Sequence, residues 1–277
     1  MGHKQSKLKQ KEKKKLIFSF AGGGWTFPFY FGVAKYLSDN FDKLEKEFDI
    51  VLCGNSAGAI ACSALIIGLD IEKMNKYGIE MRKDGYFSNI NNALSMNVFV
   101  KTLIENSFPT FLDYTQFNDR LYILLTEYEY YNKFTPKYFN KFDNRETILQ
   151  LLNASCFIPV LCGQMFCNID DSLFLDGGIC TNYITGISYP DEIDDTYIKV
   201  PVSTYLENED EGICSGKKFP KYWTYVPESK EKLEKIYELG YLKAQEFFMT
   251  NTIFKEFVIH KKSIGEKIKD IQETLLN

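Results

Sequence analysis

The chain has 277 residues, of which 45% are apolar and 25% are charged. This balance excludes fibrous, low-complexity and disordered proteins, because there is enough apolar surface for one large core or two small ones. The seven cysteines are odd in number and nowhere spaced as Cys-x-x-Cys. A disulfide scaffold or a zinc site is therefore not indicated. We expect reduced thiols, in a protein that faces the cytosol. The longest apolar run, 57–69, is shorter than the roughly 18 residues that cross a membrane.

Charge is unevenly distributed along the chain. Residues 1–15 contain seven lysines and one glutamate, a balance of +6, so that the net charge of −4 leaves −10 for residues 16–277. A cationic arm on an acidic body binds nucleic acid or an anionic membrane, and charge alone does not choose between them.

Two details of the arm favour the membrane. The opening Met-Gly-His-Lys-Gln-Ser fits the myristoylation pattern with Gly2 as the acylated residue. The lysines that follow supply the second signal that a single acyl chain needs for stable anchoring. We therefore expect a disordered, membrane-facing arm at 1–15, a peripheral cytoplasmic location, an anionic membrane or lipid droplet as partner, and no nucleic acid. A solvated arm with a chance match to the pattern is the alternative.

The first half of the chain alternates between strand-like and helix-like segments. An apolar run at 16–21 ends at glycine, as a buried strand does, and a helix is predicted at 28–38 because proline is tolerated in a first turn. A second buried strand at 48–53 leads through 54–58 into an apolar helix at 57–69. Two consecutive strand-turn-helix units predict a parallel sheet with helices on its faces.

Beyond residue 70 the pattern is less regular, and 71–120 is predicted to be mixed and mainly helical. The further predicted elements are strands at 121–130, 135–142 and 172–175 and helices at 146–154, 228–249 and 256–276. No repeat and no clear linker divide the chain. We therefore expect a main domain at 16–190, with an acidic loop and helical extension at 191–277 packed on the same domain.

Gly54-Asn55-Ser56-Ala57-Gly58 is a G-x-S-x-G pentapeptide between a predicted strand and a predicted helix. In this context the serine occupies a sharp turn that projects its hydroxyl beyond the sheet, while the helix N-terminus and the next amide point at an oxyanion formed there. Ser56 is therefore the candidate nucleophile, and the Ala57 amide a candidate oxyanion donor. The alternative is a glycine-rich turn in which the serine only caps the helix.

Gly22, Gly23 and Gly24 occupy the turn after the first predicted strand. Glycines let backbone amides approach a substrate closely, so these three are further candidate oxyanion donors. A dinucleotide-binding turn is the competing interpretation, but it requires glycine at position 27, where Phe27 stands.

Asp176, followed by two glycines, ends the predicted strand at 172–175. If the strands run parallel, this carboxylate lies at the same edge of the sheet as the pentapeptide 54–58, here called the elbow. It can then reach Ser56 as general base. A plain Asp-Gly turn is the alternative. The only histidines are His3, on the arm, and His260, so a Ser-His-Asp triad would need His260. A serine-aspartate pair needs no histidine, metal or cofactor.

Taken together, the motifs resemble those of the patatin-like phospholipases. The resemblance covers about residues 16–185 and rests on four segments in order and spacing: Ser19-Phe-Ala-Gly-Gly-Gly24, Gly54-Asn-Ser-Ala-Gly58, Ala154-Ser155 with Ile158-Pro159 after it, and Asp176-Gly-Gly178 with Asn182 beyond it. The sequence Ser-Phe-Ala-Gly at 19–22, together with Phe-Gly-Val-Ala at 31–34, is most similar to the animal branch of the family, which contains adipose triglyceride lipase.

The resemblance implies an α/β protein with a three-layer α/β/α patatin-like fold, a mainly parallel central sheet and a helical C-terminal extension. It implies a Ser56/Asp176 dyad, an oxyanion hole built from the Gly22 to Gly24 amides, and hydrolysis of acyl esters of phospholipids or neutral glycerolipids. The chain departs from the family pattern at Phe27, where glycine is usual, and at Tyr183, where proline is usual.

Two classes of function follow from these motifs. One is a serine acyl hydrolase, a phospholipase A or acylglycerol lipase, whose basic arm holds it on lipid. Four aromatic residues then either face acyl chains or belong to the core, namely Trp25, Phe27, Phe29 and Tyr30. The other is a catalytically silent lipid-surface adaptor. The joint presence of Ser56 and Asp176 favours the enzyme, because an adaptor has no physical need for both.

Overall fold

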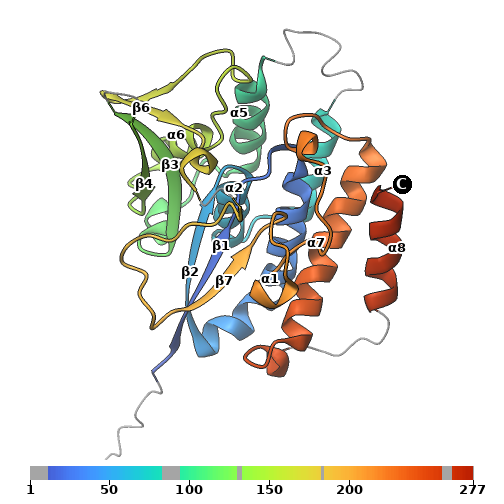
Figure 1. Ribbon diagram of the computed structural model, residues 1–277. Helices are drawn as coiled ribbons and strands as arrows, with labels where there is room; N and C mark the ends of the chain where they lie inside the picture. The colour runs from blue at the N-terminus through green and yellow to red at the C-terminus, as the bar shows by residue number, and fades with distance from the viewer. Residues whose placement is uncertain (1–11, 83–93, 130–132, 182–183, 258–263, 277) are drawn as a thin grey trace, which may run out of the picture.

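The computed structural model describes residues 12–82, 94–129, 133–181, 184–257 and 264–276. Its centre is a sheet in which four strands run parallel in the order β3-β2-β1-β7 (Figure 1). These strands are β1 (Lys14–Phe20), β2 (Phe48–Asn55), β3 (Leu121–Glu129) and β7 (Ile198–Val202). Three antiparallel strands extend the sheet beside β3, namely β4 (Lys133–Phe139), β5 (Cys167–Ile169) and β6 (Ser172–Leu175).

Helices connect and cover these strands. They are α1 (Phe27–Glu47), α2 (Ala57–Ile66), α3 (Ile71–Met81), α5 (Met96–Ser107), α6 (Arg145–Ser155), α7 (Lys230–Thr250) and α8 (Ile264–Leu276). The prediction ended the first helix at residue 38, but Leu37, Phe41 and Leu44 continue its apolar stripe against the core. The second helix ends before residue 69 because Gly68, with φ of +64°, terminates it.

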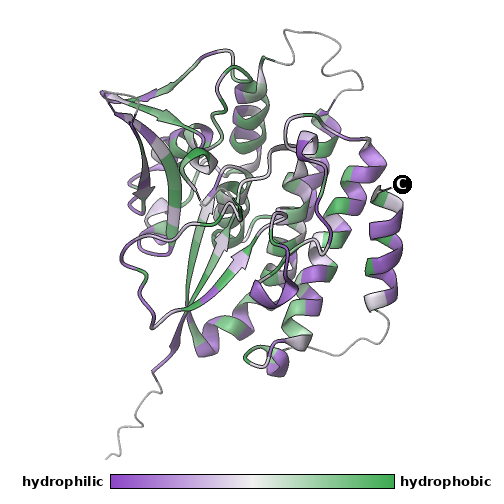
Figure 2. Cartoon of the chain, in the orientation of Figure 1, coloured by the Kyte–Doolittle hydropathy of each residue, from purple (hydrophilic) through white to green (hydrophobic). Residues whose placement is uncertain are grey.

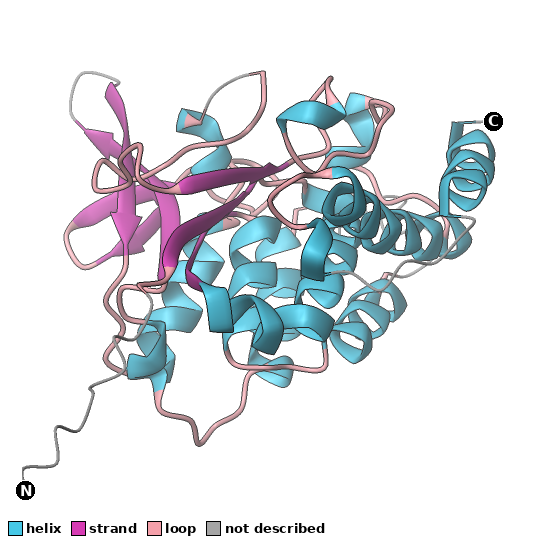
Figure 3. Ribbon diagram, turned by 90° about the horizontal axis from the view of Figure 1, so that it is seen from below, coloured by secondary structure: helices cyan, strands magenta, loops and turns pink. Residues whose placement is uncertain are grey.

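The two faces of the sheet are covered differently. Leu16, Phe18 and Phe20 of β1 join the main core together with α1, α2, α6 and α7. On the opposite face Ile17, Val51 and Tyr122 form a smaller cluster with Ile193, and Figure 3 shows most helices on one side of the strands. The α/β fold class, the parallel centre and the helical C-terminal part are therefore confirmed. Within the described chain, the second face is covered by the segment 184–197 rather than by a helix.

The direction of β6 departs from the sequence argument. That argument assumed a parallel strand, and the assumption is wrong, because β6 is antiparallel to β3. One edge of β3 carries β4, while the other carries β2 along its first half and β6 along its second half. Asn55 of β2 lies opposite Leu124, and Leu175 of β6 lies opposite Thr126. The carboxyl ends of β2 and β6 therefore point at each other, and the residues after them meet end to end.

The C-terminal helices are part of the same packed body. α7 lies along α1 so closely that a Cβ at Gly240 would stand 2.1 Å from the carbonyl oxygen of Phe29. Figure 2 shows hydrophobic residues along β1 and β2 and hydrophilic residues on the outer side of α8. None of the helices in the described segments is long and apolar enough to cross a membrane.

Candidate active site

Ser56 stands at the sharp turn between β2 and α2. Its backbone has φ of 51° and ψ of −129°, a conformation that is strained for any residue with a side chain. Ser56 is the N-cap residue of α2, yet its side chain makes no capping hydrogen bond. The backbone at Ser56 is therefore strained although the hydroxyl does not cap the helix. This argues against the interpretation of Ser56 as a simple serine cap.

Ser155, at the end of α6, holds the elbow in place. The Ser56 amide donates to the Ser155 Oγ at 2.9 Å, and that hydroxyl in turn donates to the carbonyl oxygen of Leu124 at 2.7 Å. The Ser155 side chain is fully buried. Sequence reasoning used Ser155 only as part of the family resemblance and gave it no role. The structure makes it the link between the elbow and β3.

Asp176 follows β6 and is buried, with 7% of its surface exposed. Its Oδ1 accepts the Gly178 amide at 2.8 Å, and the Thr126 hydroxyl donates to its carbonyl oxygen at 2.8 Å. Its Oδ2 accepts no hydrogen bond of normal length within the described chain, although the Ser56 hydroxyl is close enough to act on the carboxyl group. The structure thus brings Ser56 and Asp176 together.

The burial of Asp176 changes its acidity. Loss of hydration raises the pKa of this carboxyl from an ordinary 3.8 to about 6, while the Gly178 amide and the Ser56 hydroxyl act in the opposite direction. A carboxylate with a pKa in this range is a better base than an exposed aspartate and remains ionised at neutral pH. The Asp-Gly-Gly turn is present as an Asx-type turn, but its second carboxylate oxygen is free to take a proton.

The three glycine motifs converge on Asn55, the second residue of the elbow pentapeptide. A Cβ at Gly22 would lie 2.5 Å from the Asn55 Oδ1 and 2.9 Å from the Ser56 Cβ. A Cβ at Gly177 would lie 2.8 Å from the Asn55 Cβ. Only glycine permits such close approach. Asn55 donates to the carbonyl oxygen of Gly186 at 3.2 Å, so it also holds the segment after Asp176. Sequence reasoning did not identify this residue.

The backbone amides at the site are free for an additional acceptor. Within the described segments, the amides of Gly22, Gly23, Gly24 and Ala57 donate to no protein acceptor. The Ala57 amide belongs to the first turn of α2, a helix whose ten residues are all buried. Helix N-termini attract negative charge because their first amides are unpaired. Among the predicted oxyanion donors, Gly22 lies against Ser56, and Gly24 and Ala57 line the same pocket as Ser56.

Tyr30 of α1 holds the glycine turn 22–24 in place by a hydrogen bond and by ring packing. Its hydroxyl donates to the carbonyl oxygen of Gly22 at 3.1 Å and lies 3.2 Å from the Thr204 Oγ1. A Cβ at Gly23 would stand 2.3 Å from the Tyr30 ring, so the ring packs directly under the turn. Burial raises the pKa of Tyr30, and the phenol stays neutral. This residue is part of the core and supports the site.

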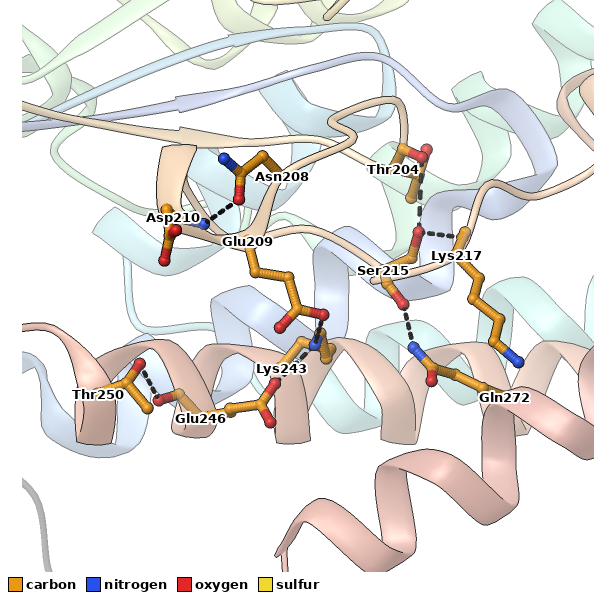
Figure 4. A network of polar contacts seen from close by, with 10 residues as sticks. All are labelled: Thr204, Asn208, Glu209, Asp210, Ser215, Lys217, Lys243, Glu246, Thr250 and Gln272. Carbon is orange, nitrogen blue, oxygen red and sulfur yellow. Dashed lines mark hydrogen bonds and ion pairs between the residues drawn. The ribbon is translucent and has the colours of Figure 1, made fainter.

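A polar network connects this support to the C-terminal helices (Figure 4). The backbone of Thr204 accepts from Ser215 at 3.5 Å, and Gln272 of α8 donates to the Ser215 carbonyl at 2.7 Å. Beside them, the buried ammonium of Lys243 in α7 binds Glu209 and Glu246, each at 2.6 Å. The helical extension therefore stabilises the loop that holds Tyr30 and, through it, the glycine turn.

An apolar pocket opens at Ser56, and the space that it shares with open solvent amounts to about 430 Å³. It is lined by Gly24, Trp25, Phe27, Phe31, Ser56, Ala57, Ile60, Met96, Phe99, Val100, Leu103 and Cys156. Of the four aromatics considered above, Trp25 and Phe27 line it, whereas Phe29 and Tyr30 are buried in the core away from it. The departure at position 27 thus supplies part of the pocket wall. Burial raises the pKa of the Cys156 thiol, which stays neutral beside the serine.

Five residues named above lie outside the described part of the chain. They are Gly2, His3, Asn182, Tyr183 and His260. The predictions on lipid attachment, on a triad through His260 and on the Tyr183 departure therefore stay predictions.

The comparisons with known proteins agree with this geometry. The family model for patatin-like phospholipases matches residues 18–187, a stretch that contains all four segments on which the resemblance rests. The chain belongs to the patatin-like phospholipase family. The expected family is thereby confirmed.

Individual relatives are more distant. The human patatin-like phospholipase domain-containing protein 2 is 26% identical over 167 residues, which is 59% of this chain and 32% of that protein. The cattle protein of the same name is 27% identical over 167 residues, 59% of this chain and 33% of that protein. The chain therefore spans about a third of the length of these relatives. The crystal structure of VipD from Legionella pneumophila is 14% identical with a TM-score of 0.48, covering 96% of this chain and 75% of that one.

Proposed function

We propose that this protein is a serine acyl hydrolase of lipids that works with a Ser56/Asp176 dyad. The observation that supports the proposal is the end-to-end meeting of β2 and β6. The strained turn at Ser56 follows one strand, and the buried carboxyl of Asp176 follows the other. The unused amides of Gly22, Gly23, Gly24 and Ala57 supply the oxyanion hole. The apolar pocket at the same serine takes the acyl chain.

The chemistry needs no group beyond these. Asp176 takes the proton of Ser56 as Oγ bonds to the ester carbonyl carbon, and the backbone amides stabilise the resulting oxyanion. When the intermediate collapses, the ester bond breaks and the leaving alcohol takes the proton from Asp176. Water, deprotonated by Asp176, then attacks the acyl-serine, releases the fatty acid, and the proton returns to Ser56.

The pocket favours long acyl chains over polar substrates. Its wall consists mainly of aromatic and aliphatic side chains, so it gains free energy by removing an acyl chain from water. Phospholipids and acylglycerols both present such chains, and the proposal covers phospholipase A and acylglycerol lipase activity. A catalytically silent lipid-surface adaptor is the alternative, and it would bind vesicles without releasing fatty acid.

A fluorophosphonate probe is expected to label Ser56 in the folded protein, and Ser56→Ala is expected to abolish labelling. Peptide mass spectrometry identifies the labelled residue, and a panel of phospholipids, triacylglycerols and lysolipids identifies the substrate class by fatty acid release. Ser63→Ala is the matched control, because Ser63 lies buried in the same helix and only bonds to the Ala59 carbonyl. An unlabelled Ser56 in folded protein with free lipid access would overturn the proposal in favour of the adaptor.

The basic arm is proposed to hold the protein on anionic lipid, with Gly2 as the acylated residue. Mass spectrometry of protein made in a eukaryotic host is expected to show a myristoyl group at Gly2. Binding to anionic vesicles is expected to weaken with salt, because exposed charges are screened beyond about 10 Å at 0.1 M ionic strength. An unmodified Gly2 would contradict the lipid anchor. Vesicle binding that does not change with salt would contradict a contribution of the lysines.

A further inference from the structure

Several exposed apolar side chains lie on segments that adjoin the pocket. Six of them, each between 46% and 58% exposed, form what is here called the rim: Val98, Val160, Met165, Ile179, Tyr222 and Tyr225. Most other large apolar side chains of the described chain are buried in the core. Single exposed apolar residues are normal on a protein surface, but a group on segments that adjoin one opening indicates an interaction site.

The contacts of the chain place the rim at the pocket. Val98 lies on α5 between the lining residues Met96 and Phe99. The loop that carries Val160 and Met165 is joined to α5, because the Met96 amide donates to the carbonyl oxygen of Leu161 at 3.0 Å.

Two more segments carry the rest of the rim. Ile179 follows the candidate base Asp176 by three residues. Tyr222 lies two residues before Thr224 and Tyr225 one residue after it. The carbonyl oxygen of Thr224 would stand 2.0 Å from a Cβ at Gly24, and Gly24 lines the pocket. The segments that carry the rim are thus joined to the pocket lining at α5 and at Gly24, and one of them follows Asp176.

Apart from Lys221, which directly precedes Tyr222, the residues next to each rim position carry no charge, although α5 continues to Lys101 beyond Val98. Aspartate, glutamate, lysine and arginine make up 25% of the chain, yet none occurs in the stretches 94–100, 153–169, 177–190 and 222–227. A surface with few charges gains little from anionic headgroups and loses little on leaving water. Tyrosine, with an apolar ring and a polar hydroxyl, suits the boundary between acyl chains and headgroups. The rim thus fits an uncharged or zwitterionic lipid surface.

The described part of the basic arm, residues 12–15, lies at the other end of the sheet. The described chain begins at Glu12, and Lys14 pairs with Phe48 at the start of β2, whereas the elbow follows the end of β2. Seven residues of β1 separate the two edges, about 20 Å at 3.3 Å per residue. The edge at which residues 12–15 enter the sheet is therefore not the edge that holds the pocket mouth.

We propose that the rim is a docking surface for zwitterionic or neutral lipid, which seats the pocket mouth on the lipid surface independently of the basic arm. The inference rests on the proposed function, since an acyl ester inside a lipid layer reaches Ser56 only through that mouth. A protein partner on the rim would close the mouth, whereas a lipid layer supplies the substrate to it.

The test uses the full, unacylated chain and vesicles of dialkyl ether phosphatidylcholine, which carry no ester to cleave. The rim variant combines Val98→Ser, Met165→Ser and Tyr222→Ser, one from each of three segments. Its binding to these vesicles in 0.5 M salt is expected to fall at least 10-fold. Its hydrolysis of a soluble short-chain ester is expected to stay within 2-fold of the original chain, because none of the three residues lines the pocket.

The control variant is Phe111→Ser. Phe111 is 95% exposed, more than any other large apolar residue of the described segments, and it lies between the end of α5 and the start of β3, outside the segments that carry the rim. Its replacement is expected to leave vesicle binding unchanged.

The outcomes separate the docking surface from the proposed function. Rim-dependent binding to ether vesicles by a chain that cleaves no ester supports the docking surface and overturns the enzyme. If the rim variant hydrolyses both soluble esters and vesicle esters as fast as the original chain, the docking surface is overturned and the enzyme is not. The docking surface is also overturned if Phe111→Ser weakens vesicle binding as much as the rim variant does. It is likewise overturned if the rim variant changes self-association of the protein and leaves vesicle binding unchanged.

Discussion

Replacing Asp176 by asparagine is expected to lower kcat by about 10³-fold or more, while making the folded protein more stable at pH 7. The loss of activity follows because the amide cannot accept the Ser56 proton, and general-base catalysis contributes on the order of 10²–10⁴-fold. The gain in stability follows because ionised Asp176 is buried with one unpaired oxygen. Asparagine keeps an oxygen for the Gly178 amide and removes the buried charge.

The sign of the stability effect follows from the pKa. Because the folded-state pKa of Asp176 is raised from 3.8 to about 6, the folded state holds this proton more tightly than the unfolded state. The contribution of Asp176 to the free energy of unfolding therefore falls as pH rises from about 4 to about 6. Above this window the cost is at most on the order of 3 kcal/mol. Asp176→Asn removes it, so its stability advantage is expected to grow across the same window.

Urea denaturation at pH 4 and pH 7 measures the stability difference, and the pH dependence of kcat/KM measures the base. In the original chain kcat/KM is expected to reach half of its plateau near pH 6. Asp70→Asn is the control for both readouts, since Asp70 is an exposed helix cap at α3. His260→Ala is expected to retain activity. Loss of activity in His260→Ala together with an active Asp176→Asn would contradict the dyad and favour a triad.

The sequence was sufficient for the parts of the site that depend on neighbouring strands. β1 and β2 are adjacent and parallel, so the glycine turn after one and the elbow after the other had to reach the same edge of the sheet. Both turns also carry local signals, namely glycine runs after apolar strands. The end of α2 was predictable as well, because Gly68 is the usual helix terminator.

The path to Asp176 was not predictable from local pattern. Its strand has four residues and could run in either direction. Its position is set by β3, which extends beyond the end of β2 and leaves an edge free for an antiparallel partner. The strand β7 was missed because its five residues include Pro201 and follow an acidic loop. Strand direction and edge sharing are properties of the whole sheet, which periodicity does not encode.

The supporting residues were missed for a related reason. Ser155, Asn55 and Tyr30 act through contacts with segments distant in sequence, and serine, asparagine and tyrosine have ordinary structural roles elsewhere. Only the position of Asn55 inside the elbow and of Ser155 inside the family motif gave a signal. Their roles depend on which backbone groups the fold leaves unpaired, and this becomes visible only in three dimensions.

Gly22→Ala is expected to lower kcat by about 10²–10³-fold with little change in KM, because it removes oxyanion stabilisation that acts mainly in the transition state. A Cβ at this position would stand 2.9 Å from the Ser56 Cβ and 2.5 Å from the Asn55 Oδ1. The turn must therefore move away from the elbow, and its amides with it. Fluorophosphonate labelling of Ser56 is expected to slow in parallel, since the probe forms an equally charged intermediate.

The matched control is Gly265→Ala in α8, where a Cβ meets nothing within 4 Å and alanine favours the helix. It is expected to leave both rates unchanged. Thermal unfolding separates a displaced turn from a damaged fold. A Gly22→Ala protein that unfolds near the temperature of the original chain but has lost turnover supports the oxyanion role, because the substitution then moved the turn without breaking the core. Full turnover in that variant would contradict the role, since no arrangement keeps the amides in place with a methyl group against Ser56.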